Sequence, residues 1–306
     1  MLPNPLLITL LGPTAVGKTI LAARLSHAIG GEVISADSRQ VFRGMDIGTG
    51  KDISDYIVGD VKIPFHLIDI ADAGTEYSVY SFLRDFESAY NIISNNGKVP
   101  VLCGGTGLYL EAVLKGYNLV EVPENPVFRL GMQVFSDAEL LAQLMIKRPL
   151  HNTTDSILRD RIIRALEIET FKEQHAAILK NNFRESLVFG LRFERQLIRE
   201  RITQRLILRL ENGMVEEVEM LMKRGVSVSM LKYYGLEYKY LSMYLLGELT
   251  FDRMFALLNT AIHQFAKRQM TWFRRMERSG VKIHWLEGEK GLDQNLISML
   301  SMISKG

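Results

Sequence analysis

The sequence predicts an α/β fold, in which helices cover a parallel β-sheet. Three observations carry this prediction. Short runs of residues are apolar at every position rather than at alternate positions, as in strands that are buried on both faces. Each run ends in a polar or glycine-rich turn, and stretches with apolar residues at helical spacing lie between the runs. Strands that alternate with helices in this way are typical of a parallel sheet.

The expected elements follow in chain order. The predicted strands are Leu6–Leu11, Glu32–Ala36, Phe65–Ile70, Val99–Cys103, Val188–Arg192 and Val281–Leu286. Apolar residues at helical spacing predict helices over Lys18–Ile29 and Ser78–Asn95, each of which links two of these strands. From Gln196 almost to Met276 helical periodicity dominates, with interruptions near residues 225–229 and 233–235. The C-terminal half is therefore expected to be helical.

A change of character after Gly116 indicates an insertion into this core. Pro123 and Pro126 follow closely, and the sequence from there to about Phe183 is typical of short helices. We therefore expect a core formed by residues 1–117 and 185–306, interrupted by a small helical insertion domain at residues 118–184.

Composition excludes several classes of protein. The 306 residues are 47% hydrophobic, which is enough for one large core or two modest ones. The net charge of +2 gives no overall nucleic-acid signature, although Lys267–Arg278 gathers five basic residues against one acid. Cys103 is the single cysteine, which excludes a disulfide framework and a cysteine-based zinc site. The amino-terminal segment lacks a basic region and a long apolar run, so we expect a cytoplasmic protein that does not bind a membrane.

The strongest local signal is Gly12–Thr19, which fits the pattern G-x-x-x-x-G-K-[ST] between a predicted strand and a predicted helix. In such a P-loop, glycines let backbone N–H groups turn inward around phosphate oxygens, and the next helix points its positive end at them. Lys18 adds a mobile positive charge, and the Thr19 hydroxyl is placed to bind Mg²⁺. A plain strand–helix turn is the alternative. The motif predicts a P-loop NTPase-like sheet with phosphate contacts from Gly12, Pro13, Thr14, Ala15, Val16, Gly17, Lys18 and Thr19.

The P-loop alone does not define the reaction. Most P-loops hold nucleoside triphosphates, and an acidic residue after a second apolar strand would then be expected. The apolar run Val99–Cys103 ends instead in Gly104–Gly107, which contains no acid. This absence weakens the interpretation as a kinase.

Four further blocks accompany GPTAVGKT at Gly12–Thr19. They are ISADSRQVFRGMDIGTGK at Ile34–Lys51, HLIDI at His66–Ile70, GGTGLYL at Gly104–Leu110 and AKRQMTWFRR at Ala266–Arg275. Together, in this order, the five blocks resemble the tRNA dimethylallyltransferase (tRNA isopentenyltransferase) family. They reach both ends of the chain and are far more specific than one P-loop.

The resemblance implies a reaction and its partners. Dimethylallyl diphosphate, bound by the P-loop, donates its five-carbon group to N6 of the adenosine just 3′ of the anticodon, and pyrophosphate leaves with the help of Mg²⁺. The expected RNA partner is the anticodon stem-loop of a tRNA, held by the helical C-terminal half, and the enzyme is expected to be a monomer. The chemistry suits these residue types, because cations and N–H groups neutralise the pyrophosphate charge and a carboxylate accepts the N6 proton.

The catalytic residues that the resemblance implies are Asp37, Thr19 and Arg205. Asp37 matches the family's base, at the end of the second strand and beside the cradle, although a turn or N-cap aspartate is the plain alternative. Arg205 matches an arginine that reaches the pyrophosphate, and an arginine fork suits a diphosphate well. Because Arg201, Arg205 and Arg209 recur every four residues, a solvated helix face is the alternative.

The same resemblance implies a set of tRNA contacts. They are Asp37, Ser38, Arg39, Gln40, Thr106, Arg161, Arg164, Lys267, Arg268, Gln269, Trp272 and Arg274. Thr106 is expected near the reacting centre or the RNA, with a helix-cap role as the alternative. Trp272 either stacks on a base or packs into the core, whereas Phe273 is expected in the core.

The sequence also departs from the family pattern. A Gly-Tyr-Arg-type motif aligns with Lys232–Glu237, where the expected basic residue is missing and Lys232 or Lys239 would have to replace it. The insertion is poorly matched as well. His66, at a strand start, and Cys103, on a buried strand, are expected to be structural and inert. The six histidines show no metal-ligand spacing.

Three other functions remain open at this stage. An adenylate isopentenyltransferase would share the P-loop and Asp37 but would not need the Ala266–Arg275 block. A small-molecule P-loop kinase would need the missing acid. A non-enzymatic nucleotide-binding RNA chaperone would not need Asp37 beside an intact P-loop.

Overall fold

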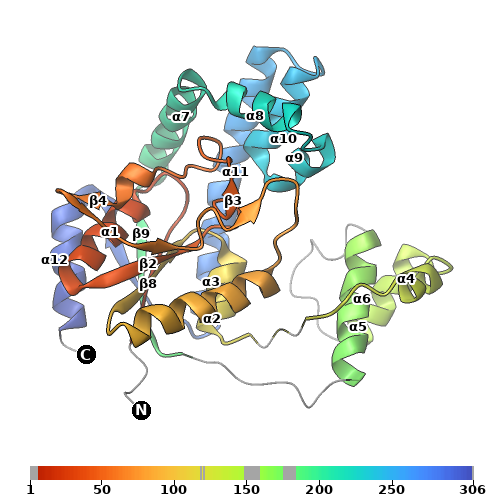
Figure 1. The fold of residues 1–306 in the computed structure, drawn as a ribbon, viewed down its shortest axis with the longest axis horizontal. Helices are drawn as coiled ribbons and strands as arrows, with labels where there is room; N and C mark the ends of the chain where they lie inside the picture. The colour runs from red at the N-terminus through yellow and green to blue at the C-terminus, as the bar shows by residue number, and fades with distance from the viewer. Residues whose placement is uncertain (1–5, 118, 120, 148–158, 175–183, 305–306) are drawn as a thin grey trace. The chain divides into compact units, whose positions relative to one another are not determined.

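A six-stranded, all-parallel sheet organises the chain in the computed structural model, which describes residues 6–117, 119, 121–147, 159–174 and 184–304 (Figure 1). The strand order is β10-β9-β1-β8-β2-β6. The bounds are β1 Leu7–Leu11, β2 Gly31–Ala36, β6 Phe65–His66, β8 Val99–Gly104, β9 Ser186–Arg192 and β10 Ile283–Glu287. Every neighbouring pair in this sheet is parallel. The predicted α/β fold class is confirmed.

Both faces of the sheet are buried, which explains why its strands are apolar at successive positions. Leu7 and Leu11 of β1 belong to one core cluster, whereas Ile8 and Leu10 belong to the cluster on the opposite face. Residues of helices α2 (Val79–Asn95), α3 (Gly107–Leu114) and the end of α11 (Phe251–Arg278) build the first cluster. Residues of α1 (Lys18–Ile29) and α12 (Leu292–Ile303) build the second.

The helices after β9 form a third core of their own. They are α7 Arg195–Glu211, α8 Met214–Lys223, α9 Val228–Tyr234, α10 Leu236–Leu245 and the first part of α11. Helix α11 has 28 residues and contributes Met254, Leu258 and Ile262 to this core, but Phe273 and Met276 to the sheet core. A single helix therefore belongs to both. None of the helices in the described ranges is long and apolar enough to cross a membrane.

The predicted strand Phe65–Ile70 was too long. Only Phe65–His66 pairs with β2, because Leu67 and Asp69 take positive φ angles of 62° and 56° that end the strand. The Asp69 carboxylate turns to the buried Lys51 ammonium, which also binds Asp46 Oδ1 at 2.7 Å and the carbonyl oxygen of Phe42 at 2.8 Å. An ion cluster therefore fixes this segment where an apolar strand was expected.

Further short elements lie between β2 and α2. They are β3 Phe42–Arg43, the 3-10 helix η1 Ile53–Tyr56, β4 Ile57–Val58, β5 Val61–Lys62 and β7 Ala71–Asp72. The 3-10 helix η4 Gly288–Lys290 follows β10. The carboxylate of Glu217 in α8 accepts the backbone N–H groups of Asp46, Ile47 and Gly48 at 2.6–3.1 Å. Polar ties from two directions therefore hold the loop between β3 and η1.

The chain divides into two compact units, one formed by residues 1–117 and 183–306 and the other by residues 118–182. The described helices of the second unit are α4 Pro126–Met132, α5 Asp137–Lys147 and α6 Arg159–Gln174. They share a small apolar core, in which Leu140 and Leu144 of α5 pack with Ile162 and Leu166 of α6.

Phe273→Ala is expected to lower the free energy of unfolding of the first unit by about 3–5 kcal/mol, because Phe273 is fully buried. Urea unfolding followed by tryptophan fluorescence measures this unit alone, since both tryptophans of the chain, Trp272 and Trp285, lie in it. Gln264→Ala, at an exposed position of the same helix, is the matched control and is expected to change stability by less than about 0.5 kcal/mol. Equal effects of the two variants would contradict the assignment of Phe273 to the core.

Candidate active site

The loop Gly12–Thr19 joins β1 to α1 in a tight turn at the start of the helix. Gly17 takes a φ of 81° at the N-cap of α1 and offers no side chain to cap it, so the first N–H groups of the helix face the loop. A Cβ atom at Gly12 would lie 2.4 Å from the carbonyl oxygen of Leu191 on β9, so only glycine fits there. The loop therefore has the strand–turn–helix context that the motif requires.

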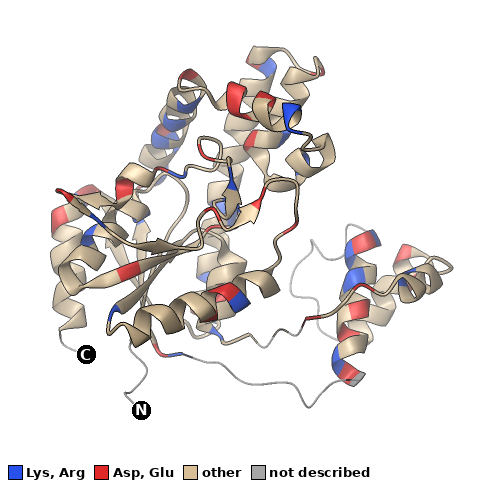
Figure 2. Ribbon diagram, viewed as in Figure 1, with Lys and Arg blue, Asp and Glu red and all other residues tan. Residues whose placement is uncertain are grey.

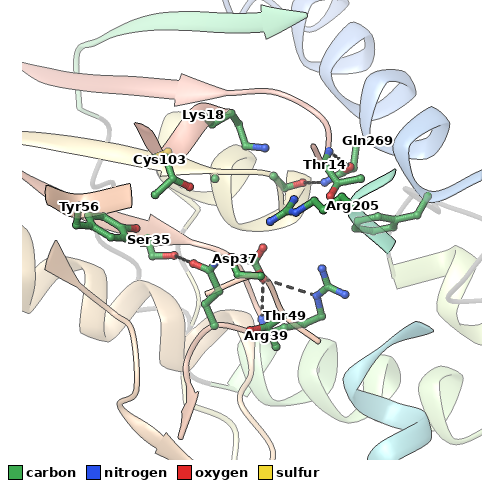
Figure 3. Close-up of a pocket in the computed structure, with 16 residues that line it drawn as sticks. Thr14, Lys18, Ser35, Asp37, Arg39, Thr49, Tyr56, Cys103, Arg205 and Gln269 are labelled. Carbon is green, nitrogen blue, oxygen red and sulfur yellow. Dashed lines mark hydrogen bonds and ion pairs between the residues drawn. The ribbon is translucent and has the colours of Figure 1, made fainter. Parts of the chain in front are cut away.

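A pocket opens over this loop at the carboxyl edge of the sheet (Figure 3). Its walls come from the P-loop, the ends of β2 and β8, the segment around η1, and helices α7 and α11. The lining residues are Thr14, Lys18, Thr19, Ser35, Asp37, Arg39, Gln40, Thr49, Gly50, Tyr56, Cys103, Gly104, Gly105, Arg205, Phe265 and Gln269. Lys18, Arg205 and Asp37 point into the same space. Together with Arg39, three cations and one carboxylate thus share this pocket.

Burial shifts the pKa values of two groups at the floor of the pocket. Burial lowers the pKa of Lys18 to about 8, and the nearby Arg205 lowers it as well, while Asp37 opposes the change. The Lys18 ammonium donates to the carbonyl oxygen of Pro13 at 2.6 Å. Burial also raises the pKa of the Cys103 thiol to about 12. An anion bound here would further stabilise the charged form of Lys18.

Asp37 follows β2 directly. In the sheet order β8 lies between β1 and β2, so Asp37 faces the P-loop across the end of β8. Its Oδ1 accepts the backbone N–H of Arg39 at 2.9 Å, which is a local turn contact. Asp37 also lines the pocket, so the turn contact does not withdraw its carboxylate from the pocket.

Arg39 is held by a residue that sequence reasoning missed. Its guanidinium donates to Glu237 Oε2 of α10 at 2.5 Å, and its Nε lies 3.8 Å from Asp37 Oδ1. Burial by itself would lower the pKa of Arg39, but the Glu237 and Asp37 carboxylates raise it above its ordinary value. The divergent segment Lys232–Glu237 therefore supplies an inward-facing acid that fixes Arg39.

Thr106 and Gln40 tie the loop after β2 to its neighbours. Thr106 stands at the N-cap of α3 without capping it, and its hydroxyl oxygen accepts the backbone N–H of Ser38 at 3.0 Å. The Gln40 side chain accepts from the Ser35 hydroxyl and donates to the carbonyl oxygen of Gly50, both at 3.0 Å. The Asp37–Gln40 segment is thus positioned through both its backbone and its side chains.

Two of the α7 arginines turn toward the P-loop and the pocket. Figure 2 shows the basic bands along this helix. Arg201 donates to the carbonyl oxygen of Ala15 in the P-loop at 2.9 Å, and Arg205 lies 3.2 Å from Asp52 Oδ2 while lining the pocket. Arg205 therefore lines the pocket and does not lie on a fully solvated helix face.

Helix α11 is attached to the P-loop. Gln269 accepts the backbone N–H of Thr14 at 2.9 Å and donates to the carbonyl oxygen of Gly105 at 2.8 Å. Trp272 donates to Glu111 Oε2 of α3 at 2.8 Å, so its indole packs between the two helices. The expected RNA contacts Gln269 and Trp272 are therefore engaged inside the protein, whereas Lys267, Arg268 and Arg274 are exposed.

Comparison with known proteins agrees with this geometry. A sequence profile described as IPP transferase matches residues 40–276. The chain belongs to the IPP transferase family. The resemblance seen in the sequence is thereby confirmed.

Relatives of this IPP transferase cover nearly all of it. The tRNA dimethylallyltransferase 2 of Bacteroides fragilis is 52% identical over 297 residues, which is 96% of this chain and 97% of the relative. The full-length tRNA isopentenylpyrophosphate transferase of Bacillus halodurans is 30% identical, with a TM-score of 0.71 over 98% of this chain and 96% of that one. A eukaryotic dimethylallyltransferase, whose crystal structures are described as showing it acting on tRNA, has the same fold, with a TM-score of 0.75 at 22% identity. The match covers 98% of this chain and 79% of that one.

The insertion unit of this IPP transferase carries the two remaining sequence candidates. Arg161 is exposed on α6. Arg164 donates to Glu167 at 2.5 Å and to the carbonyl oxygen of Val122 at 2.7 Å, so it stabilises the unit itself. Their expected contacts with tRNA remain predictions.

The Cys103 thiol is expected to react slowly with iodoacetamide in the folded IPP transferase. At pH 8, a pKa of about 12 leaves about 10³-fold less thiolate than an ordinary thiol has, and the thiolate is the reactive form. The alkylation rate should rise about tenfold per pH unit from pH 8 to 10 without levelling off. Mass spectrometry of this single cysteine measures the rate, with the urea-unfolded chain as control. A plateau near pH 9 would indicate steric protection of a thiol with an ordinary pKa.

Proposed function

We propose that this IPP transferase moves the dimethylallyl group of dimethylallyl diphosphate to N6 of the adenosine 3′ of the anticodon in tRNA. The C–O bond to the diphosphate breaks, the C–N bond forms, the N6 proton passes to a base, and pyrophosphate leaves. The observation that carries this proposal is the shared pocket, in which Lys18, Arg205 and Asp37 converge over an intact P-loop. The names of the close relatives support it.

The P-loop side suits the leaving diphosphate. Its backbone N–H groups, the Lys18 ammonium and the Arg205 guanidinium surround a position where negative charge develops as the C–O bond breaks. Because burial lowers the pKa of Lys18 to about 8, the pocket gains from the arrival of an anion that keeps this group charged. An arginine fork adds two directed donors to the same charge.

The residues present also fit Mg²⁺. Thr19 and Asp37 bring two hard oxygen donors to the pocket, and within the described ranges no cluster of three or more histidine, cysteine or acidic residues forms a metal cage. Mg²⁺ is commonly held by one or two protein ligands together with substrate phosphates and water. When bound, it would neutralise part of the pyrophosphate charge, with Thr19 as its protein ligand.

The β2 side suits the adenine. An exocyclic amine is a weak nucleophile, so a carboxylate must accept its proton as the C–N bond forms. Asp37 uses one oxygen, Oδ1, in the local turn, and its position in the pocket leaves the carboxylate open to a substrate. Arg39 lies beside it and forms its closer ion pair with Glu237, at 2.5 Å against 3.8 Å for Asp37.

The tRNA side is assigned to α11. Lys267, Arg268 and Arg274 are exposed on this helix, while Gln269 fastens the same helix to the P-loop. Phosphate contacts and the reaction pocket would therefore be joined through one rigid element. An enzyme for free adenylate has no use for such a surface. A kinase is disfavoured because Gly104–Gly107, at the end of β8, contains no acid. A monomeric state and a cytoplasmic location remain predictions.

A transfer assay tests the proposed function directly. Labelled dimethylallyl diphosphate is offered with tRNA, with AMP or alone, and label is expected in tRNA only. Asp37→Asn keeps the shape of the side chain but removes the proton acceptor, so kcat should fall about 10²–10⁴-fold while tRNA affinity changes far less. Transfer to AMP alone would favour adenylate prenylation, and a change in KM for tRNA without a change in kcat would place the base elsewhere.

Lys267→Ala combined with Arg274→Ala is expected to weaken tRNA binding and to lower the slope of log K against log salt by about 1–2 units. Each phosphate contact releases counterions when the tRNA binds, so the loss of a contact reduces the number released. Affinity for dimethylallyl diphosphate should stay unchanged. The matched control is Lys98→Ala with Lys282→Ala, which removes the same charge at exposed positions directly before β8 and β10, on the opposite edge of the sheet. Equal effects of the two double variants would show that only net charge matters.

A further inference from the structure

Phe265 is the residue of the pocket for which the fold gives no packing reason. On α11 the neighbouring apolar residues Ile262, Ala266 and Phe273 are buried in the cores. Phe265 is only half-buried, lines the pocket, and belongs to none of the four core clusters that the described residues form. The other aromatic ring of the pocket, Tyr56, is by contrast part of the sheet core.

The ring of Phe265 has cations near it but no close stacking partner among them. The guanidinium carbons of Arg39 and Arg268 lie 5.8 and 6.0 Å from its centroid, at the outer limit of a cation–π contact. In the closer pair Arg275–Trp272, by comparison, the guanidinium carbon lies 4.1 Å from the centroid of the indole ring. The comparison indicates that the two arginines flank the Phe265 ring without covering it in direct contact.

The position of Phe265 links the two sides of the site. It lies one helical turn before Gln269, which binds the P-loop, and two residues before the exposed Lys267. Arg39, one of its flanking cations, stands two residues from Asp37. A planar group that enters from the exposed face of α11 toward Asp37 would therefore meet this ring.

We propose that Phe265 is the stacking platform for the adenine that swings out of the RNA loop, with Arg39 and Arg268 at its edges. This inference rests on the proposed function. Extruding a base from a loop costs its stacking energy, and an aromatic ring in the pocket replaces that lost contact. Guanidinium groups beside the ring offer donors to the acceptor nitrogens of a purine. The dimethylallyl group is the competing occupant of the ring, and the test separates the two.

The test combines protein variants with two RNA hairpins. Phe265→Ala, Phe265→Leu and Phe265→Tyr are compared on an anticodon stem-loop that carries either adenosine or an abasic site at the target position. Wild type is expected to bind the adenosine hairpin about 5- to 100-fold more tightly than the abasic one. Phe265→Ala should lose most of this preference, and its kcat/KM for the RNA should fall by a similar factor. Phe265→Tyr should keep both, and Phe265→Leu should resemble alanine because it lacks a flat face.

Each outcome decides one question. If Phe265→Ala keeps the adenosine preference, the inference is overturned. If it instead weakens dimethylallyl diphosphate binding in the absence of RNA and the preference persists, the ring serves the allyl group. If wild type transfers no label to any RNA, the proposed function fails, whatever the variants do. An unchanged urea midpoint in Phe265→Ala confirms that the fold is intact, as expected for a residue outside the cores.

Discussion

All strands of the main sheet run in one direction, and the site depends on this constraint. Because parallel strands share their carboxyl edge, the segments that follow β1, β2, β8 and β9 meet there. The first delivers the P-loop, the second delivers Asp37, the third delivers Thr106, and the fourth leads into the helix that carries Arg205. Four stretches that are distant in the sequence therefore line or border one pocket. The apolar character of the strands, buried on both faces, fixes this edge in place.

Polar ties rather than apolar packing then set the details of the site. The buried acids Glu111 and Glu237 each collect donors from another element, and the buried Lys51 does the same for carboxylates. Glu111 shows the balance in its pKa. Burial would raise it, but the bonds from Lys115 and Arg275 bring it below its ordinary value. A charged group held by several hydrogen bonds fixes both the distance and the orientation of its partners, because each hydrogen bond weakens steeply when its angle changes.

The sequence was sufficient for the features that local patterns encode. Three such features are local: the P-loop, the two helices that follow the first and third predicted strands, and the succession of strands along the chain. The structure has all of them. Contacts between distant residues left no such pattern. Glu237 holds Arg39 across 198 positions, and Gln269 reaches Thr14 across 255. The strand expected over Phe65–Ile70 was too long for the same reason. The Lys51 cluster binds Asp69, and an apolar run does not reveal this contact.

In the proposed function, helix α11 sets the spacing between the RNA-binding face and the diphosphate pocket. Each residue of an α-helix advances 1.5 Å and turns about 100°, so the face that bears Lys267 and the face that bears Gln269 keep a fixed angle and spacing. The ends of this helix are anchored in two different cores, which leaves no slack to absorb a shift. Inserting or deleting one residue between Phe265 and Arg274 would rotate the basic face out of phase with the P-loop attachment. Length variation in this family should therefore be confined to places such as the insertion unit, while this stretch keeps a constant length.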